Sequence, residues 1–256
     1  YLKMPNPVQD KAQLLRVIEQ HLTPRTRVAS FMHVDTITGL QMPMADIAAI
    51  TRPRDILLVC DGAQTPGMLD IDVRALGVDA FASSSHKWLL APKGTGLLYI
   101  RKQVQDRIHP LSLMKGYTAY SGSGGTRDVA GILGHGTAID FHNAIGKARI
   151  EARCRQLSMR VREHLRQIPR LRLLTPEQEE LSSGMVTFAV DGVKNSEVHK
   201  KLWEDYGIAA KVAQGTYVYT EVAAQLGENY NCLRFSTHIY NDESQVDRLA
   251  EALATI

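Results

Sequence analysis

The sequence predicts an α/β fold built on a mainly parallel sheet, followed by a smaller α+β region. The first observation is that amphipathic helical segments alternate with short, continuous apolar runs in the first part of the chain. This alternation is typical of βαβ units, whose parallel strands are buried on both faces. The second is size and composition: 256 residues, 44% hydrophobic and 22% charged, suffice for two modest domains. We expect the larger domain over residues 1–140 and the smaller over residues 141–256.

Local signals predict each element of the larger domain. Apolar residues recur at helical spacing from Asp10 to Leu22, and Met44 to Thr51 is a second expected helix, behind Pro43. Strands are expected in four apolar runs: Val28–Val34, Ile56–Cys60, Phe81–Ser83 and Gly96–Ile100. The last two runs are separated by a segment rich in Ser, Pro and Gly. Because loops at the strand ends of such sheets carry the binding groups, we expect the chemistry in that segment.

The smaller domain follows a long helical pattern from about Ile139 to Ile168, which Pro169 ends. Its further expected elements are a strand, a helix, two strands and a closing helix: Met185–Val190, Ser196–Tyr206, Ile208–Val212, Leu233–Ser236 and Glu243–Leu253. Asn241 and Asp242 are the candidate N-caps of the closing helix.

Charge and cysteine usage exclude several classes of protein. The 30 basic and 27 acidic residues are scattered, which predicts no nucleic-acid partner. The three cysteines form no CxxC or Cys/His pattern, so we expect buried cysteines and neither a zinc site nor disulfides. No apolar run reaches the roughly 18 to 20 residues that span a bilayer, so no membrane association is expected. Residues 1–5 have no signal-peptide layout and no initiator Met; the cytoplasm is the default compartment and the periplasm an alternative.

The most informative stretch runs from Ser83 to Trp88 and is followed by Ala91–Gly96. Lys87 stands just after an expected strand, among hydroxyl groups and an imidazole. A lysine that forms a Schiff base needs this setting: a fixed amine near groups that can hold a phosphate. By itself, a lysine in a Ser-rich loop is more often a solvated surface charge. The Gly and Lys order of Pro92–Gly96 does not match the phosphate loop of nucleotide-binding proteins.

A second feature, Asp61-Gly62-Ala63-Gln64, strengthens that interpretation. It places a carboxylate at the end of a buried strand and an amide three residues later. Such an Asp can pair with a protonated pyridine nitrogen while the amide reaches a ring hydroxyl. Asp61 alone would more often be a helix N-cap. Together, Asp61 and Lys87 favour a pyridoxal 5'-phosphate (PLP) site.

Here the chain resembles the class V aminotransferase family, the fold-type I PLP enzymes that include cysteine desulfurases, isopenicillin N epimerase-like proteins and C–S lyases. Five motifs in family order carry the resemblance: His33–Gly39, Asp61–Gln64, Ser84–Lys87, Gly125–Thr126 and Leu233–Asn241. Each is weak alone, and the five together are a strong signal. The resemblance runs over essentially the whole chain and implies a PLP-binding large domain of fold-type I with a small C-terminal domain.

The resemblance also implies a role for each matching residue. Lys87 would hold PLP and act as the general base at the substrate Cα. Asp61 would pair with the ring nitrogen and Gln64 with the ring oxygen, while Ser84 and His86 would hold the phosphate. Thr126 would reach the phosphate of the neighbouring subunit in a homodimer. Arg234 would clamp the substrate carboxylate; the alternative for this residue is a surface ion pair.

Three departures from the family pattern bear on function. Thr36 stands where desulfurases carry Asn, as in the isopenicillin N epimerase-like branch, so a substrate-binding role is expected for it. The loop Ala213–Tyr219 has no cysteine, and Cys232 is too close to Arg234 to be a mobile sulfur carrier, which disfavours a desulfurase. The family also has a further N-terminal stretch, with a phosphate-binding turn and a ring-stacking side chain, that this sequence does not contain.

The resulting hypothesis is a PLP enzyme acting at Cα of an amino acid or a similar small molecule. It leaves transferase, isomerase and lyase activities open, because PLP stabilises the same carbanion for all three. The alternatives are a periplasmic transaminase acting on a peptide siderophore, a C–S lyase, and a non-catalytic relative. The last would normally lose Lys87 or Asp61, and both are present.

Overall fold

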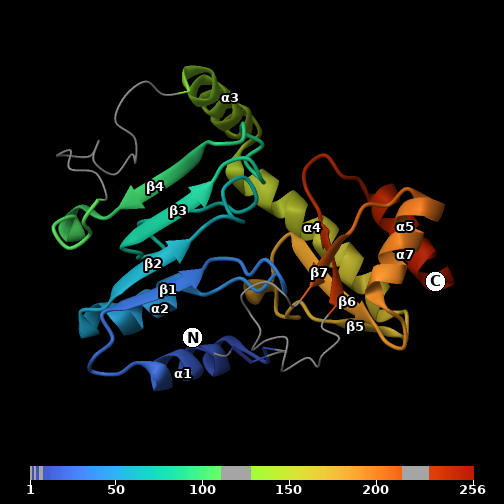
Figure 1. Ribbon diagram of the computed structural model, residues 1–256, viewed down its shortest axis with the longest axis horizontal. Helices are drawn as coiled ribbons and strands as arrows, with labels where there is room; N and C mark the ends of the chain where they lie inside the picture. Colours follow the sequence, from blue (N-terminus) through green and yellow to red (C-terminus); the bar gives the residue numbers. More distant parts are fainter. Residues whose placement is uncertain (1, 3, 6–7, 111–127, 215–230) are drawn as a thin grey trace. The chain divides into compact units, whose positions relative to one another are not determined.

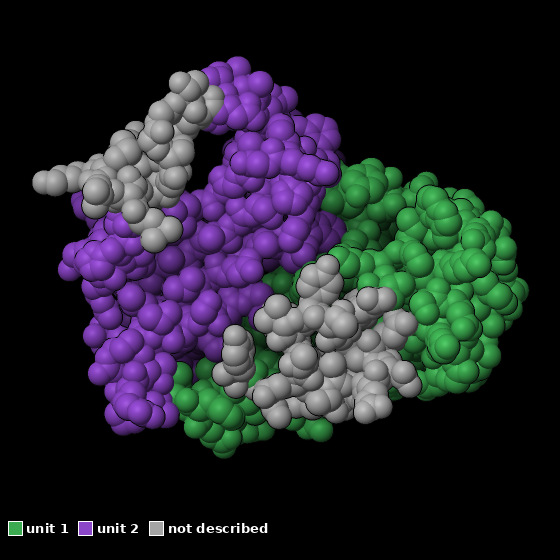
Figure 2. All heavy atoms as spheres, in the orientation of Figure 1, with its two compact units in different colours: residues 1–22, 34–42, 151–256 green, residues 23–33, 43–150 purple. Residues whose placement is uncertain are grey.

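The computed structural model describes residues 2, 4–5, 8–110, 128–214 and 231–256, and the structural statements below concern these residues. The chain forms two compact units, each of which is described by itself (Figure 2). Unit 1 joins residues 1–22, 34–42 and 151–256; unit 2 joins residues 23–33 and 43–150. The domain boundary between residues 140 and 141 stays a prediction.

Unit 2 is built on a four-stranded sheet with the order β1-β2-β3-β4 (Figure 1). Its strands are β1 (Val28–Met32), β2 (Leu57–Asp61), β3 (Ala80–Ser84) and β4 (Gly96–Ile100). The β1–β2 and β2–β3 pairs are parallel, whereas β3–β4 is antiparallel. The sheet is therefore mixed but mostly parallel, which confirms the predicted fold class. Because β2 and β3 are parallel neighbours, the residues that follow them emerge at the same edge of the sheet.

Among the helices of this part of the chain, the first agrees with the prediction and the long one does not. Helix α2 (Met44–Thr51) has the predicted bounds and packs against β2. The single helix expected from Ile139 to Ile168 is two helices, α3 (Val129–Ile145) and α4 (Lys147–Arg166). Gly146 separates them with a φ of +97°, a conformation that breaks a right-handed helix and that glycine adopts without steric cost. The short 3-10 helices η1 (Arg52–Arg54) and η2 (Lys102–Val104) complete unit 2.

Unit 1 contains an antiparallel sheet with the order β5-β6-β8-β7. Its strands are β5 (Leu171–Leu173), β6 (Met185–Val190), β7 (Lys211–Gln214) and β8 (Asn231–Ser236). Its remaining elements include α1 (Lys11–His21), η4 (Glu179–Leu181), α5 (Asn195–Tyr206) and α7 (Glu243–Thr255). Helix α5 packs on β6, β7, β8 and α7, so the core lies between sheet and helices (Figure 1). The strand predicted at Ile208–Val212 begins later, at Lys211.

Aspartate side chains cap the starts of two helices, and the second of them is one of the two predicted cap candidates. The Asp10 side chain accepts a hydrogen bond from the Gln13 N–H at 2.6 Å, which fixes the start of α1. Asp242 does the same for α7, accepting from the Gln245 N–H at 2.9 Å. The neighbouring candidate, Asn241, instead accepts from the His238 N–H through its side-chain oxygen.

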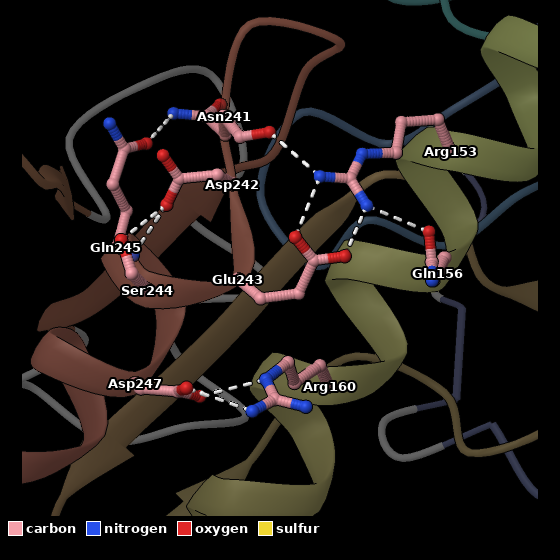
Figure 3. A network of polar contacts seen from close by, with 9 residues as sticks. All are labelled: Arg153, Gln156, Arg160, Asn241, Asp242, Glu243, Ser244, Gln245 and Asp247. Carbon is pink, nitrogen blue, oxygen red and sulfur yellow. Dashed lines mark hydrogen bonds and ion pairs between the residues drawn. The ribbon is translucent and has the colours of Figure 1, made fainter.

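Two arginine–carboxylate pairs connect α4 to the start of α7 (Figure 3). Arg153 donates to both carboxylate oxygens of Glu243, at 2.5 and 3.0 Å, and Arg160 donates to both oxygens of Asp247, at 2.7 and 2.8 Å. His164 also contacts Asp247 at 2.9 Å. The hydrogen bonds from Arg153 and Arg160 lower the pKa values of Glu243 and Asp247, each to about 2.

This network predicts an acid-sensitive contribution to stability. A carboxylate whose pKa is lowered by folding stabilises the protein above its ordinary pKa of roughly 4, and this stabilisation is lost as the pH falls toward 2. We expect Arg153→Gln to lower the melting temperature by about 1 to 3 °C at pH 7. The difference from the native protein should shrink between pH 5 and roughly pH 2. The control is Arg149→Gln, at an exposed position of the same helix; a pH-independent effect of Arg153→Gln would contradict the prediction.

All three cysteines are free and buried, with Cys60, Cys154 and Cys232 at most 1% exposed, as the sequence predicts. Burial raises the pKa of the Cys60 and Cys154 thiols to about 12, so these two stay protonated at neutral pH. Among the described residues, no group of His, Cys, Asp and Glu is placed to hold a metal ion. No helix in the described ranges is long and apolar enough to cross a membrane.

Candidate functional site

Asp61 is the last residue of β2, and the sheet holds its backbone from both sides. The Asp61 C=O accepts a hydrogen bond from the His33 N–H at 2.8 Å. The N–H of the next residue, Gly62, donates to the Ala82 C=O at 2.7 Å. The carboxylate accepts from the Ala63 N–H at 2.8 Å. The residues that follow form a turn and no helix, so Asp61 is not the helix N-cap of the alternative interpretation. Its side chain is instead fixed, and exposed, at the carboxyl edge of the sheet.

The structure brings several of the predicted residues to one open cleft of about 1110 Å³. Asp61, Ser84 and His86 line it, from the ends of the parallel strands β2 and β3. Residues 94–96 and strand β4 line it as well. Lys87 follows directly after His86, and both side chains are exposed. A carboxylate, a hydroxyl group and an imidazole therefore share this cleft, and the lysine stands next to it in the chain.

Lys87 lies at the start of a tight turn. The Leu90 N–H donates to the Lys87 C=O at 3.3 Å, and the Ala91 N–H donates to the Ser85 C=O at 3.0 Å. Leu90 has a φ of +59°, which costs a non-glycine residue roughly 1 to 2 kcal/mol and must be imposed by its surroundings. The central residues of this turn, Trp88 and Leu89, are 6% and 7% exposed. The buried part of the turn thus anchors it, while Lys87 projects outward.

Gln64 is buried, is not among the residues that line the cleft, and is held by Trp88. The Trp88 indole Nε1–H donates to Gln64 Oε1 at 3.0 Å. An indole N–H can only donate, so the partner must be the amide oxygen, which fixes the orientation of the Gln64 amide. The Gln64 NH₂ group consequently points away from Trp88. This orientation suits the predicted task, since a phenolic ring oxygen accepts from an N–H donor.

Gly67 approaches the same turn so closely that only glycine fits. A Cβ there would lie 2.3 Å from the Trp88 carbonyl oxygen, and the φ of Gly67 is +87°. We expect Gly67→Ala to destabilise the protein by about 2 to 4 kcal/mol, since backbone strain and overpacking add. Gly94→Ala is the matched control, because Gly94 has a φ of +86° and a Cβ there would meet nothing within 4 Å. It should cost only about 1 kcal/mol; equal losses in urea titration would contradict the close contact.

Arg234 and Thr36 meet in unit 1. Arg234, on β8, donates through Nη1 to the Thr36 carbonyl oxygen at 2.6 Å and to Thr36 Oγ1 at 2.8 Å. Its Nε is buried and has no hydrogen-bond partner within the described ranges. Burial lowers the pKa of Arg234, although the guanidinium remains charged at neutral pH. Arg234 is therefore a largely desolvated cation with donor capacity that Thr36 does not use, unlike a surface ion pair.

Two predicted features lie outside the described residues, and one residue at the site was not predicted. Thr126 lies outside the described residues, as do residues 215–219 of the cysteine-free loop. Trp88, which fixes the amide of Gln64, was not predicted as a part of the site. The only signal in the sequence was an aromatic residue directly after Lys87 in an otherwise polar stretch.

Comparisons with known proteins found a matching family and similar sequences. The model of the family Aminotransferase class-V matches residues 2–249. Isopenicillin N epimerase from Streptomyces clavuligerus is 34% identical over 272 residues, which cover 98% of this chain and 65% of that protein. A probable cysteine desulfurase from Halalkalibacterium halodurans is 29% identical over 253 residues, covering 92% of this chain and 59% of that protein.

Solved structures share the fold. The apo structure of a cysteine desulfurase from Thermococcus onnurineus NA1 has a TM-score of 0.84 at 24% identity, covering 98% of this chain and 64% of that one. A C-DES mutant with glycine covalently linked to its PLP cofactor has a TM-score of 0.79 at 26% identity, covering 97% and 64%. The chain thus spans 59 to 65% of the length of these four relatives.

Proposed function

The chain belongs to the class V aminotransferase family of PLP-dependent enzymes, and from that premise we propose that it acts at Cα of an amino acid or a similar small molecule. The observation that carries the proposal is the meeting of Asp61, Ser84 and His86 in one cleft, with Lys87 adjacent.

The donor set fits the chemical groups of PLP. The cofactor has an aldehyde, a ring nitrogen, a ring oxygen and a phosphate, and each needs a different partner. The amine of Lys87 suits the aldehyde, and the carboxylate of Asp61 suits a protonated ring nitrogen. The NH₂ group of Gln64 suits the ring oxygen, in the orientation that Trp88 imposes. The Ser84 hydroxyl and the His86 imidazole suit the phosphate, and Thr126 would complete its binding from the partner subunit of a homodimer.

When bound, PLP supplies an electron sink for the charge that develops at Cα. The protein residues then bind, orient and move protons. The Lys87 amine would take and return the Cα proton. Asp61 would pair with the ring nitrogen, and its negative charge would favour the protonated form of that nitrogen. Arg234 binds the substrate carboxylate through N–H groups that Thr36 does not occupy, and Thr36 holds the guanidinium in place.

An isopenicillin N epimerase-like reaction is the favoured activity within this class. Its support is the 34% identity to an isopenicillin N epimerase and the absence of a cysteine from the loop Ala213–Tyr219. The buried state of all three cysteines also disfavours a reaction that needs a mobile thiol. A C–S lyase reaction is the second candidate, because a probable cysteine desulfurase is 29% identical and a similar solved structure is that of the cystine C–S lyase C-DES.

Proton exchange at Cα tests the proposed function across many candidate substrates at once. The PLP-treated protein is incubated in D₂O with a panel of amino acids and of short peptides in which one Cα carries both a free amino group and a free carboxylate. We expect deuterium at Cα of at least one compound, detected by NMR, and loss of this exchange in Lys87→Ala. Racemised product would support the epimerase assignment, and pyruvate with a released thiol would favour the lyase. No exchange in any compound would contradict the proposal.

A further inference from the structure

Trp88 is held at its indole and at its backbone. The indole N–H donates to Gln64 Oε1 at 3.0 Å, and the Trp88 carbonyl oxygen lies 3.2 Å from Nε2 of His142. His142 is 54 residues further along the chain, near the C-terminal end of α3, and only 3% exposed. The residue directly before Trp88 is Lys87. A side chain remote in sequence therefore contacts the peptide unit that begins one residue after the proposed cofactor-binding lysine.

Helix α3 contacts the Lys87 turn at a second place. A Cβ at Gly134 would lie 2.7 Å from Pro92 Cγ, so the helix backbone approaches residue 92 closely. Gly134 and His142 are eight residues apart, about two helical turns, and therefore share one face of the helix. Ala138, midway between them, is buried as well. This face of α3 thus packs along the segment that runs from Trp88 to Pro92.

The two ring nitrogens of His142 face different carbonyl groups. Nδ1 lies 2.9 Å from the Ala138 carbonyl oxygen, within the helix, and Nε2 lies 3.2 Å from that of Trp88. Carbonyl oxygens only accept, so the contact with Trp88 requires a proton on Nε2. A neutral imidazole carries one N–H and can serve one of these two acceptors at a time. The contact that bears on the site is the one made by Nε2.

We propose that His142 is a positioning residue of the cofactor site. Its Nε2–H fixes the Trp88 carbonyl group, and Trp88 in turn fixes the start of the turn that carries Lys87 and the amide orientation of Gln64. Lys87 and Gln64 are both residues that the proposed function assigns to cofactor binding, so the inference rests on the proposed function. The effect of His142 on Lys87 and Gln64 is transmitted through Trp88.

Amide substitutions separate this role from simple packing. The Gln amide nitrogen takes roughly the place of His Nε2, and the Asn amide nitrogen roughly that of Nδ1. His142→Gln should therefore keep a donor for Trp88, whereas His142→Asn should keep only the donor for Ala138. His142→Leu removes both. Asn143→Leu, at an exposed position of the same helix, is the control.

Two measurements are made on each variant, and one of these measurements needs no cofactor. The only other tryptophan, Trp203, is 60% exposed, so Trp203→Phe leaves Trp88 as the sole emitter in all proteins compared. Acrylamide quenching of its fluorescence reports the burial of Trp88 in the cofactor-free protein. The rate of PLP attachment to Lys87, trapped with borohydride and measured by peptide mass spectrometry, reports the position of the amine. Melting temperatures verify that each variant is folded.

We expect His142→Asn and His142→Leu to increase quenching of Trp88 and to slow attachment roughly tenfold, the effect of one buried hydrogen bond. His142→Gln should stay within about threefold of the native rate. Native-like behaviour of His142→Asn would overturn the proposal, as would equal losses in the Gln and Asn variants. If PLP attached to no protein, the proposed function would fail, while quenching would still decide whether His142 holds Trp88.

Discussion

Replacing Lys87 by Ala should abolish covalent attachment of PLP while leaving the fold intact. The side chain is exposed beside the cleft that Asp61, Ser84 and His86 line, so its removal leaves no buried cavity. An amine is the one group of this donor set that can form a covalent bond with an aldehyde. The visible absorption band of PLP-treated protein and its borohydride-stable mass increase should both disappear, and Cα proton exchange should fall by several orders of magnitude.

Lys93 provides the matched control, because it is an exposed lysine in the same loop, six residues away. Lys93→Ala should retain the band and the mass increase. Both variants should melt within a few degrees of the native protein, since neither side chain is part of the buried core. A band of native intensity in Lys87→Ala would refute the assignment of the lysine.

The second large effect is expected at Arg234. Replacing it by Gln should weaken binding of substrates with a free α-carboxylate roughly a hundredfold, on the order of 3 kcal/mol. The reason is that the guanidinium is largely desolvated and keeps Nε without a hydrogen-bond partner among the described residues. The test compares an accepted amino acid with its α-carboxamide. The native protein should prefer the carboxylate strongly, and Arg234→Gln should bind the two alike.

Two further variants make this test specific. Arg172→Gln removes an exposed arginine of unit 1 that pairs with Asp191, and it should leave the preference unchanged. Arg234→Lys keeps the charge but cannot donate in the two-pronged geometry, so it should recover only part of the preference. Arg234 also links β8 to Thr36 through hydrogen bonds, so the melting temperature of each variant is measured as well. A folded Arg234→Gln protein that still prefers the carboxylate would exclude the proposed role.

The fold was predictable wherever the local pattern determines the structure. Strand β2 and the start of β3 are short apolar runs, and α2 begins directly after Pro43, so their positions follow from periodicity and backbone chemistry. The antiparallel direction of β4 is not encoded in its own residues, because an apolar run has no direction of pairing. Strand β5 has three residues and a mixed burial pattern, too short for a periodic signal. The break at Gly146 depends on one backbone angle inside a continuous helical pattern.

The site was predictable to the extent that it follows strand ends. Asp61 and Ser84 are the last residues of neighbouring parallel strands, so their proximity follows from topology. The supports of the site were not predictable, because they join residues far apart in the chain. Gln64 and Trp88 are 24 residues apart and Trp88 and His142 are 54 apart, and nothing in the local pattern around His142 indicates its partner.

The most direct test of the PLP site is to locate the covalent attachment in the native protein. PLP-treated protein is reduced with borohydride, digested and mapped by peptide mass spectrometry, with the other lysines of the same region, Lys93 and Lys102, serving as internal references. We expect one stoichiometric adduct, on Lys87, in the peptide that contains Trp88. An adduct spread over several surface lysines, or its absence from Lys87, would contradict the proposed site.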